Sequence, residues 1–552
     1  MYATLREFIE ALGAARELKR ISAPVSPILE ISEITERVSK SPAPSVSETA
    51  KTTDPRHAHL GGPALLFENV GQSSMPVAIN TFGSYERMEM ALGYHGDKGG
   101  FAALAARVEQ LVKPEPPTGL MDKMKKGLEM ARIASFAPKY VKKGICQEVI
   151  KTGDDIDLFE LPIIKAWPYD GAPRKVGYPV DPPPGGGDGR FITFAGIYTM
   201  HPEDAGKEHG VPRPSRNVGM YRAQLLDKKH TAMHWHVHHD GARHWREWKK
   251  IGQPMPLAIV LGGESVLPYA ATAPLPPGIS ELLFAGFLND KGIDLVECKT
   301  IDMQVPANAE IVIEGFVSTE CGPIGYDPRT PGSGDIGKGA VFEGPFGDHT
   351  GFYSLPDRYP IFEVTAITHR TDPIYPTTIV GPPPMEDYYM GKATERIFLP
   401  LLKTLVHDII DYHLPMFGAF HNCAFIKIKK EYPLQARRVM HAIWGAGQMA
   451  WTKFLVVVDE HVNVHDQEDV LFHLCANCDP GRDVEIVNGP LDILDHAAPR
   501  LGAGHKMGFD ATAKIPGEEA NGQPVRDWPP PQVMDDEIRA MVDRKWKEYG
   551  LD

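Results

Sequence analysis

The sequence predicts a mixed α+β protein of several domains, with an α/β region at each end and a β-rich region between them. Three observations predict this organisation. Apolar residues at helical spacing open the chain, short apolar runs between Pro- and Gly-rich turns follow from about Val149, and strand and helix patterns alternate again after about Gly391. A chain of 552 residues is long enough to form several domains with sizeable cores.

The N-terminal region is predicted to combine amphipathic helices with a buried strand. Leu5, Phe8, Ile9 and Leu12 recur at helical spacing. A segment rich in Pro, Ser, Thr and charge then predicts a loop. In order, we expect a helix from Leu5, a helix over Ile28–Val38, a loop over Ser41–Gly62, a strand over Ala64–Val70 and a basic connecting helix over Met121–Lys143.

The central region has the pattern of a sandwich or barrel, because its apolar runs are short and are separated by turn residues. Two tracts rich in proline and glycine, Asp181–Gly189 and Pro323–Gly339, are expected to be loops, and loops of this length are often functional. The expected strands are Phe191–Met200, Leu257–Gly262, Ile293–Glu297, Glu310–Val317 and Ile361–Thr368.

The region after Gly391 predicts a smaller α/β layer, since helical and strand patterns alternate. The run WPPPQ separates the last helix from this layer, so we expect that helix to dock elsewhere, on a partner subunit. The expected elements are a helix over Gly391–Tyr412 interrupted by Pro400, a strand over Cys423–Ile428, a helix over Val439–Phe454 leading into the strand FLVVVDE, and the terminal helix Met534–Lys547.

The overall composition is that of an ordinary globular protein, with 42% hydrophobic and 24% charged residues. A formal net charge of -14 argues against a nucleic-acid binder, which needs excess Lys and Arg. The six scattered cysteines do not form a disulfide framework, and the single CxxC of Cys475 and Cys478 lacks the partners of a zinc site. Without a secretory signal or a long apolar run, we expect a cytoplasmic protein with no membrane span.

The stretch Ser215–Trp248 is unusually rich in histidine and aromatic residues. Imidazoles are common metal ligands and titrate near neutral pH, so their density here predicts a metal or cofactor pocket. The alternative interpretation is an exposed polar hairpin. Glu281 begins a predicted helix, where a carboxylate also favours the helix dipole; together with Asn217 and His238 it makes a mixed nitrogen and oxygen set that suits Mn²⁺ or Mg²⁺.

Two carboxylates, Glu343 and Asp348, lie in a glycine-rich turn of the sequence EGPFGDHTG. Paired carboxylates push their pKa values apart, so we expect one to be a protonated acid while the other stays charged. Arg222 has a guanidinium fork that can hold one of them or a substrate carboxylate. The alternative interpretation is a pair of acids that stabilise the turn.

Lys392 is expected near the start of a helix that follows a triple proline, which is a natural site for a phosphate. A solvent-exposed lysine is the equally weighted alternative. The sequence contains no GxGxxG or Walker A pattern, which leaves a Rossmann or P-loop nucleotide site without support.

Taken together, these segments resemble the UbiD-type decarboxylase family. The matching pieces occur in family order over nearly the whole chain, and EGPFGDHTG is the most specific of them. They are RNVGMYR (Arg216–Arg222), MHWHVHHDGARHW (Met233–Trp245), PPGISELLFAG (Pro276–Gly286), VPANAEIVIEG (Val305–Gly315), EGPFGDHTGFY (Glu343–Tyr353) and GHKMGFDATAK (Gly504–Lys514).

The resemblance implies a reversible, non-oxidative decarboxylase of aromatic or conjugated unsaturated acids that uses prenylated FMN with a divalent metal, usually Mn²⁺, and often K⁺. It implies that Arg222, Glu343 and Asp348 are catalytic, with Asp348 as the proton donor. Asn217, His238 and Glu281 are implied as metal ligands; His236 and His239 remain alternatives to His238, which fits the family spacing from Arg222 better. The expected cofactor-binding residues are Met220, Tyr221, Arg222, His234, Trp235, His236, His239 and Asp240, with Lys392 as the phosphate candidate.

The family fold implied is an N-terminal α/β region, a central split β-barrel like that of flavin reductases, and a C-terminal α/β domain with a terminal oligomerisation helix. On this basis we expect domains at 1–145, 146–365, 366–530 and 531–552. The implied partners are a small aromatic or unsaturated acid, CO₂ and a flavin prenyltransferase that supplies the cofactor, and the implied state is a homo-oligomer.

Insertions at 41–60, 176–189 and 320–338 are longer than in the ubiquinone-pathway enzymes, which argues against a polyprenyl-hydroxybenzoate substrate. Smaller hydroxybenzoates, fused-ring acids and a CoA thioester of an aromatic diacid remain open. The competing functions are a split-barrel oxidoreductase with plain FMN, a zinc hydrolase built on the histidines, and a carboxylase subunit that fixes CO₂ or serves only in assembly.

Overall fold

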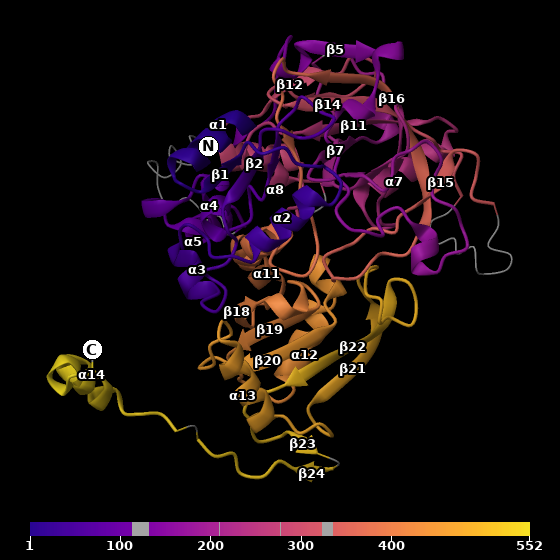
Figure 1. The fold of residues 1–552 in the computed structure, drawn as a ribbon. Helices are drawn as coiled ribbons and strands as arrows, with labels where there is room; N and C mark the ends of the chain where they lie inside the picture. The colour runs from indigo at the N-terminus through magenta and orange to yellow at the C-terminus, as the bar shows by residue number, and fades with distance from the viewer. Residues whose placement is uncertain are drawn as a thin grey trace, which may run out of the picture.

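The computed structural model describes residues 1–112, 132–208, 210–275, 278–322, 335–520, 522–530 and 532–551. Residues 121–131 of the connecting helix predicted over Met121–Lys143 lie outside the described residues, and the part that is described contains a short strand at Lys139–Tyr140. Most of the loop predicted over Pro323–Gly339 also lies outside the described residues. Figure 1 shows the N-terminal elements beside the central sheet and the C-terminal layer below both.

The N-terminal layer is a four-stranded sheet with helices packed around it. Its strand order is β1-β2-β3-β17, so a strand from far along the chain completes the sheet. The predicted loop over Ser41–Gly62 contains a short helix, because the Ser47 hydroxyl accepts from the Ala50 amide and caps it. The elements are α1 (Leu5–Ala14), β1 (Leu18–Ile21), α2 (Glu30–Ser39), α3 (Glu48–Thr53), β2 (Ala64–Phe67), β3 (Val77–Ile79), α4 (Tyr85–Leu92), α5 (Gly100–Val112) and β17 (Tyr375–Pro376).

Ten strands of the described chain form the central sheet, in the order β6-β9-β10-β16-β14-β11-β7-β8, with β15 and β5 both paired to β16. The sheet curls into a half-barrel (Figure 1). The bounds are β5 (Val149–Thr152), β6 (Phe191–Ile192), β7 (Gly196–Thr199), β8 (Asn217–Met220), β9 (Ala223–Leu225), β10 (His230–Met233), β11 (Met255–Leu261), β14 (Ile311–Val317), β15 (Ala340–Glu343) and β16 (Asp357–His369).

One predicted strand of this region, Phe191–Met200, is two strands in the structure, since Phe194 adopts a φ of 55° and turns the chain between β6 and β7. The other predicted strands are confirmed within a few residues. The strand near Ile293 is β12 (Asp294–Glu297), which pairs with β4 (Lys139–Tyr140) and β13 (Gln304–Pro306) in a small separate sheet. Helices α7 (Asp240–Lys250), α8 (Leu267–Ala270) and α9 (Glu281–Asn289) complete the region.

The C-terminal layer is a five-stranded sheet of order β18-β19-β20-β22-β21. The helix predicted over Gly391–Tyr412 with an interruption at Pro400 is confirmed as far as Leu405, but its last residues form a strand. The interruption separates two helices, and Pro400 lies in the first turn of the second, where a missing amide costs nothing. The elements are α10 (Glu386–Ile397), α11 (Leu399–Leu405), β18 (Ile409–His413), β19 (Cys423–Ile428), α12 (Gln435–Ile443), β20 (Phe454–Asp459), α13 (Gln467–Asn477), β21 (Val484–Pro490) and β22 (Ala503–Asp510).

The helix predicted near the C-terminus is α14 (Asp536–Lys545), which contains no buried residue. Figure 1 shows it at the end of an extended segment, away from the rest of the molecule. None of the helices described is long and apolar enough to cross a membrane. The boundary predicted at 365 falls inside β16, which continues to His369 before the chain returns to the N-terminal sheet.

Candidate functional site

The structure brings Arg222, Glu343 and Asp348 together in the interior. Arg222 lies between β8 and β9, and Glu343 ends β15, so separate strands deliver the two charges. Arg222 Nε and Nη2 donate to the two oxygens of Glu343 at 2.6 and 3.1 Å. Arg222 Nη1 donates to Asp348 Oδ2 at 2.8 Å. One guanidinium therefore holds both carboxylates in fixed positions.

The loop that carries the two acids is held by close contacts. Gly344 has a φ of 85°, which favours glycine. Gly347 approaches the Trp167 ring so closely that a Cβ at this position would lie 2.2 Å from the ring. The Gly347 amide also donates to Asp170 Oδ1 at 2.8 Å, and Ser354 Oγ accepts from Arg222 Nη2 at 3.1 Å. The glycines that predicted a turn thus fix the distance between Glu343 and Asp348.

Both carboxylates are ionised, which corrects the expectation that one of them is a protonated acid. Burial favours the neutral form of each, but the charge of Arg222 outweighs it at Glu343 and lowers that pKa to about 2. At Asp348, burial is outweighed by His349 and Arg222, which hold its pKa far below the usual value. The positive charge of Arg222 favours the ionised form of both carboxylates and offsets their mutual repulsion.

The histidine-rich segment lines the same region from β10 to the start of α7. His234 Nδ1 lies 3.0 Å from Glu343 Oε2, and Trp235 is fully buried. The rings of Tyr221 and His239 stack at 5.0 Å. Burial lowers the pKa of His239 to about 3, and that of His236 well below its ordinary value, so both rings are neutral.

Three buried polar atoms here have no hydrogen-bond partner within the described chain: Trp235 Nε1, Asn217 Nδ2 and His234 Nε2. The first two are donors, whereas His234 Nε2 is an acceptor, because Nδ1 of this neutral ring donates to Glu343. A buried polar atom without a partner is costly, so such groups usually await a ligand. Two donors and an acceptor in one region fit a group with several polar atoms, such as a flavin with its phosphate. Met220 is partly buried at the end of β8, and Asp240 is exposed at the start of α7.

Two of the three predicted metal ligands lie side by side. Asn217 begins β8, and the amide of the next residue, Val218, donates to Glu281 Oε2 at 3.1 Å. Burial raises the pKa of Glu281 to about 7. His238 is exposed and stacks on Trp451 of the C-terminal layer, with ring centroids 4.3 Å apart. A carboxylate beside an amide side chain is a donor set that suits Mn²⁺ or Mg²⁺.

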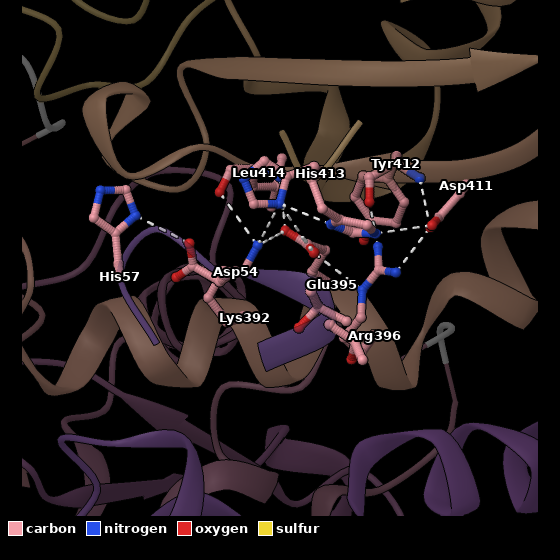
Figure 2. A network of polar contacts seen from close by, with 12 residues as sticks. Asp54, His57, Lys392, Glu395, Arg396, Asp411, Tyr412, His413 and Leu414 are labelled. Carbon is pink, nitrogen blue, oxygen red and sulfur yellow. Dashed lines mark hydrogen bonds and ion pairs between the residues drawn. The ribbon is translucent and has the colours of Figure 1, made fainter. Parts of the chain in front are cut away.

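Lys392 has partners other than a phosphate. The helix begins at Glu386, so Lys392 lies in its second turn and not at its start, and its side chain is fully buried. Figure 2 shows its amine beside Glu395 and His413, with His413 Nδ1 at 2.9 Å. The carboxylate of Glu395 occupies the position expected for an anion, which corrects the prediction of a phosphate site at this residue.

Three side chains that no sequence pattern predicted lie next to the catalytic candidates. His349 Nδ1 lies 3.0 Å from Asp348 Oδ1, and His349 Nε2 lies 2.5 Å from Nε2 of His421, 72 residues away. Asp492 offers an oxygen to the same group of atoms. His349 stands inside the quoted motif, whereas His421 and Asp492 come from loops of the C-terminal layer, where no local pattern marked them.

Three family models match most of the chain: the N-terminal, Rift-related and C-terminal domains of 3-octaprenyl-4-hydroxybenzoate carboxy-lyase, at residues 9–108, 139–383 and 388–511. An uncharacterized protein of Aquifex aeolicus is 43% identical over 551 residues, covering 100% of this chain and 99% of that protein. One of Archaeoglobus fulgidus is 41% identical over 550 residues, covering 99% and 98%.

Solved structures share the fold. HmfF of Pelotomaculum thermopropionicum, a UbiD-class enzyme in complex with FMN, is 26% identical with a TM-score of 0.67, covering 98% of this chain and 99% of that one. Vanillic acid decarboxylase of Sedimentibacter hydroxybenzoicus in its closed form is 24% identical with a TM-score of 0.74, and each chain is covered completely. The chain belongs to the UbiD family of carboxy-lyases.

Proposed function

We propose that this protein decarboxylates a small aromatic or conjugated unsaturated carboxylic acid, reversibly and without oxidation, using prenylated FMN and a divalent metal. The buried contact of Arg222 with both Glu343 and Asp348 carries the proposal, because two carboxylates held by one guanidinium are groups that proton transfer and anion binding can use. Two solved relatives support the substrate class: one is a vanillic acid decarboxylase and another a 3,4-dihydroxybenzoic acid decarboxylase from Enterobacter cloacae.

Prenylated FMN, when bound, would supply the electron sink that the carbon losing CO₂ requires. Support for a flavin comes from the unpartnered buried polar atoms and from HmfF structures with FMN and with prFMN. The side chains of Met220, Tyr221, His234, Trp235, His236, His239 and Asp240 would line it. Asn217 and Glu281, with His238 or a neighbouring histidine, would hold Mn²⁺ beside its phosphate, and we expect K⁺ as a further ion.

The protein itself would orient the substrate and move one proton. Arg222 keeps Glu343 and Asp348 at fixed positions, and Glu343 in turn orients His234. Asp348 delivers the proton to the carbon that has lost CO₂. Because carboxylation passes through the same transition state in reverse, the same residues would serve a CO₂-fixing direction, which keeps that alternative within this proposal.

The experiment is to co-express the protein with a flavin prenyltransferase, purify it without oxygen, and record the absorption spectrum, the mass of the released cofactor and the metal content. The loaded protein is then assayed for CO₂ release from hydroxybenzoates, fused-ring acids and aryl-CoA diacids. Prenylated FMN with about one Mn²⁺ per chain and CO₂ release is the expected result. Zinc without flavin, and no CO₂ release, would overturn the proposal.

A further inference from the structure

Asp348 is held from two sides. Its Oδ2 accepts from Arg222, while its Oδ1 accepts from the backbone amide of His349 at 2.8 Å and lies 3.0 Å from Nδ1 of the same residue. The other nitrogen of this imidazole, Nε2, is 2.5 Å from Nε2 of His421. A continuous line of hydrogen-bonding atoms thus leads from the carboxylate into the C-terminal layer.

The groups around His349 favour its protonated form. Burial by itself lowers an imidazole pKa, but Asp348, Asp492 and Asp387 outweigh it and raise the pKa of His349 to about 9. Burial and the neighbouring charge of His349 lower the pKa of His421 to about 4. The ring of Phe420 lies 5.5 Å from the ring of His349, and the charge of Asp495 also acts on His421.

These protonation states fix the direction of the hydrogen bonds. His349 as an imidazolium donates from Nδ1 to Asp348 and from Nε2 to the lone pair of His421, which must then carry its own hydrogen on Nδ1. That Nδ1 is buried and has no hydrogen-bond partner within the described chain, so the contact with His349 is the only hydrogen bond to the His421 ring among the described residues.

Because Asp348 is ionised, its carboxyl group does not itself hold the proton that the product needs. Decarboxylation consumes one proton for each CO₂ released, because the departing carboxylate is replaced by hydrogen. We propose that His349 stores this proton and passes it through Asp348 to the product carbon. His421 and Asp492 would position the imidazole ring. This inference rests on the proposed function.

The transfer balances as two coupled steps. The Nδ1–H bond of His349 breaks as an Oδ1–H bond forms on Asp348, which cancels one positive and one negative charge. The O–H bond then breaks as a C–H bond forms on the product. Neutral His349 regains a proton from water once the product leaves. Asp348 is therefore a conduit that need not be protonated beforehand, in agreement with its contact to Arg222.

The first test measures the proton directly on the intact protein without substrate. Protein labelled with ¹⁵N-histidine is examined by NMR between pH 6 and pH 10, and the His349 signals are assigned by their loss in His349→Gln. An imidazolium that persists to about pH 8 is expected. A neutral His349 at pH 7, or a zinc or manganese ion that is lost on His421→Asn, would overturn the proposal.

The second test separates CO₂ release from product protonation in a single turnover of cofactor-loaded enzyme. In His349→Gln we expect CO₂ to be released while product formation slows about 100-fold, as for loss of an acid catalyst. A purely structural change would slow both steps together. The control is His441→Gln, an exposed histidine on α12 outside the site.

The outcomes also separate this inference from the proposed function. A wild-type protein that carries the cofactor and releases no CO₂ from any acid tested would overturn the proposed function and this inference with it. CO₂ release accompanied by unimpaired product formation in a folded His349→Gln protein would overturn this inference alone.

Discussion

Arg222 serves four acceptor atoms with one guanidinium: both oxygens of Glu343, one of Asp348 and the hydroxyl of Ser354. Its plane also covers the Phe346 ring, with the guanidinium carbon 4.4 Å from the ring centroid. A lysine keeps the charge but lacks the fork, so it cannot hold two carboxylates in a fixed relative geometry.

For Arg222→Lys we expect kcat/KM to fall about 100-fold, since displacing a catalytic group by roughly 1 Å has an effect of that order. Steady-state kinetics on cofactor-loaded protein is the measurement. The matched control is Arg174→Lys, whose exposed ion pair with Asp181 lies at the surface and contributes little. Equal kinetics for wild type and Arg222→Lys would contradict the assigned role.

Asp348→Asn tests the acid at the end of the proton path. Its amide keeps the shape but cannot carry the proton, so we expect turnover to be abolished while the flavin stays bound. Cofactor absorbance after gel filtration and CO₂ release measure the two properties. Normal turnover in this variant would remove Asp348 from the reaction, and Asp181→Asn, an exposed carboxylate, serves as the control.

At this scale the sequence predicted the residues of one compact motif but not those that meet them from a distance. Glu343 and Asp348 are predicted because they share one glycine-rich turn, and Arg222 is predicted from its guanidinium fork and from the family resemblance of RNVGMYR. His421 was not, because the partner of His349 lies 72 residues further along and in another sheet. The protonation of the two acids was also mispredicted, since it depends on the cation between them.

Helix α10 carries a buried ionic network into the junction between the N-terminal and C-terminal layers (Figure 2). The Lys392 amine contacts one oxygen of Glu395, and the other oxygen forms an ion pair with Arg396, whose Nε lies 3.0 Å away. Arg396 Nη1 in turn donates to Asp411 of β18 at 2.8 Å. The network therefore ties the helix to the edge of the C-terminal sheet.

We expect Lys392→Met to lower the free energy of unfolding by about 3 kcal/mol, because a buried charge loses one partner while Arg396 remains. Denaturant unfolding is the measurement, and Lys429→Met, an exposed lysine, is the control. A double variant, Lys392→Met with Glu395→Leu, should recover part of the loss. Equal stability of Lys392→Met and the control would show that the network contributes little.

The ion pair of Lys392 and Glu395 should also make the free energy of unfolding depend on pH. Burial opposes ionisation of Glu395, but Lys392 and Arg396 outweigh it and hold the pKa of Glu395 well below its ordinary value. A carboxyl group whose pKa is lower in the folded state stabilises the fold at a pH above its pKa in the unfolded chain. This stabilisation is lost as the pH falls towards its pKa in the folded state. The difference in unfolding free energy between wild type and Lys392→Met should therefore narrow below about pH 4.5.

Elements were predicted well where periodicity was local and strong. The strand at Cys423–Ile428 has the predicted bounds. The helix predicted over Gly391–Tyr412 is confirmed except for its last residues, which lie on an edge strand where pairing with β19 decides the conformation. The short helix α3 was not predicted, because its segment is rich in Ser and Thr and these residues favour both loops and helix caps.

At the scale of the whole molecule, helix α14 is notable because none of its residues is buried against the rest of the chain. The helix and its flanks expose Met534, Ile538 and Trp546, whose exposed fractions are 59%, 43% and 45%. Exposed apolar residues on a helix without internal contacts are typical of an interface. We expect a second copy of the chain to cover them.

Deletion of residues 531–552 should lower the oligomeric mass measured by light scattering without lowering the melting temperature of the remaining fold, because α14 buries nothing within its own chain. The point variant Ile538→Asp should act in the same direction. Its neighbour Arg539→Asp is the control. An unchanged mass after deletion would assign the helix another role.

The return of β17 to the N-terminal sheet has a consequence for how the chain is made. Its partner strand β3 pairs with Tyr375–Pro376 in parallel, so a ribosome must synthesise some 300 further residues before this edge can close. Until then β3 presents open backbone groups, which favour unwanted pairing. The nascent N-terminal layer should thus be the segment of the chain most in need of chaperone protection during translation.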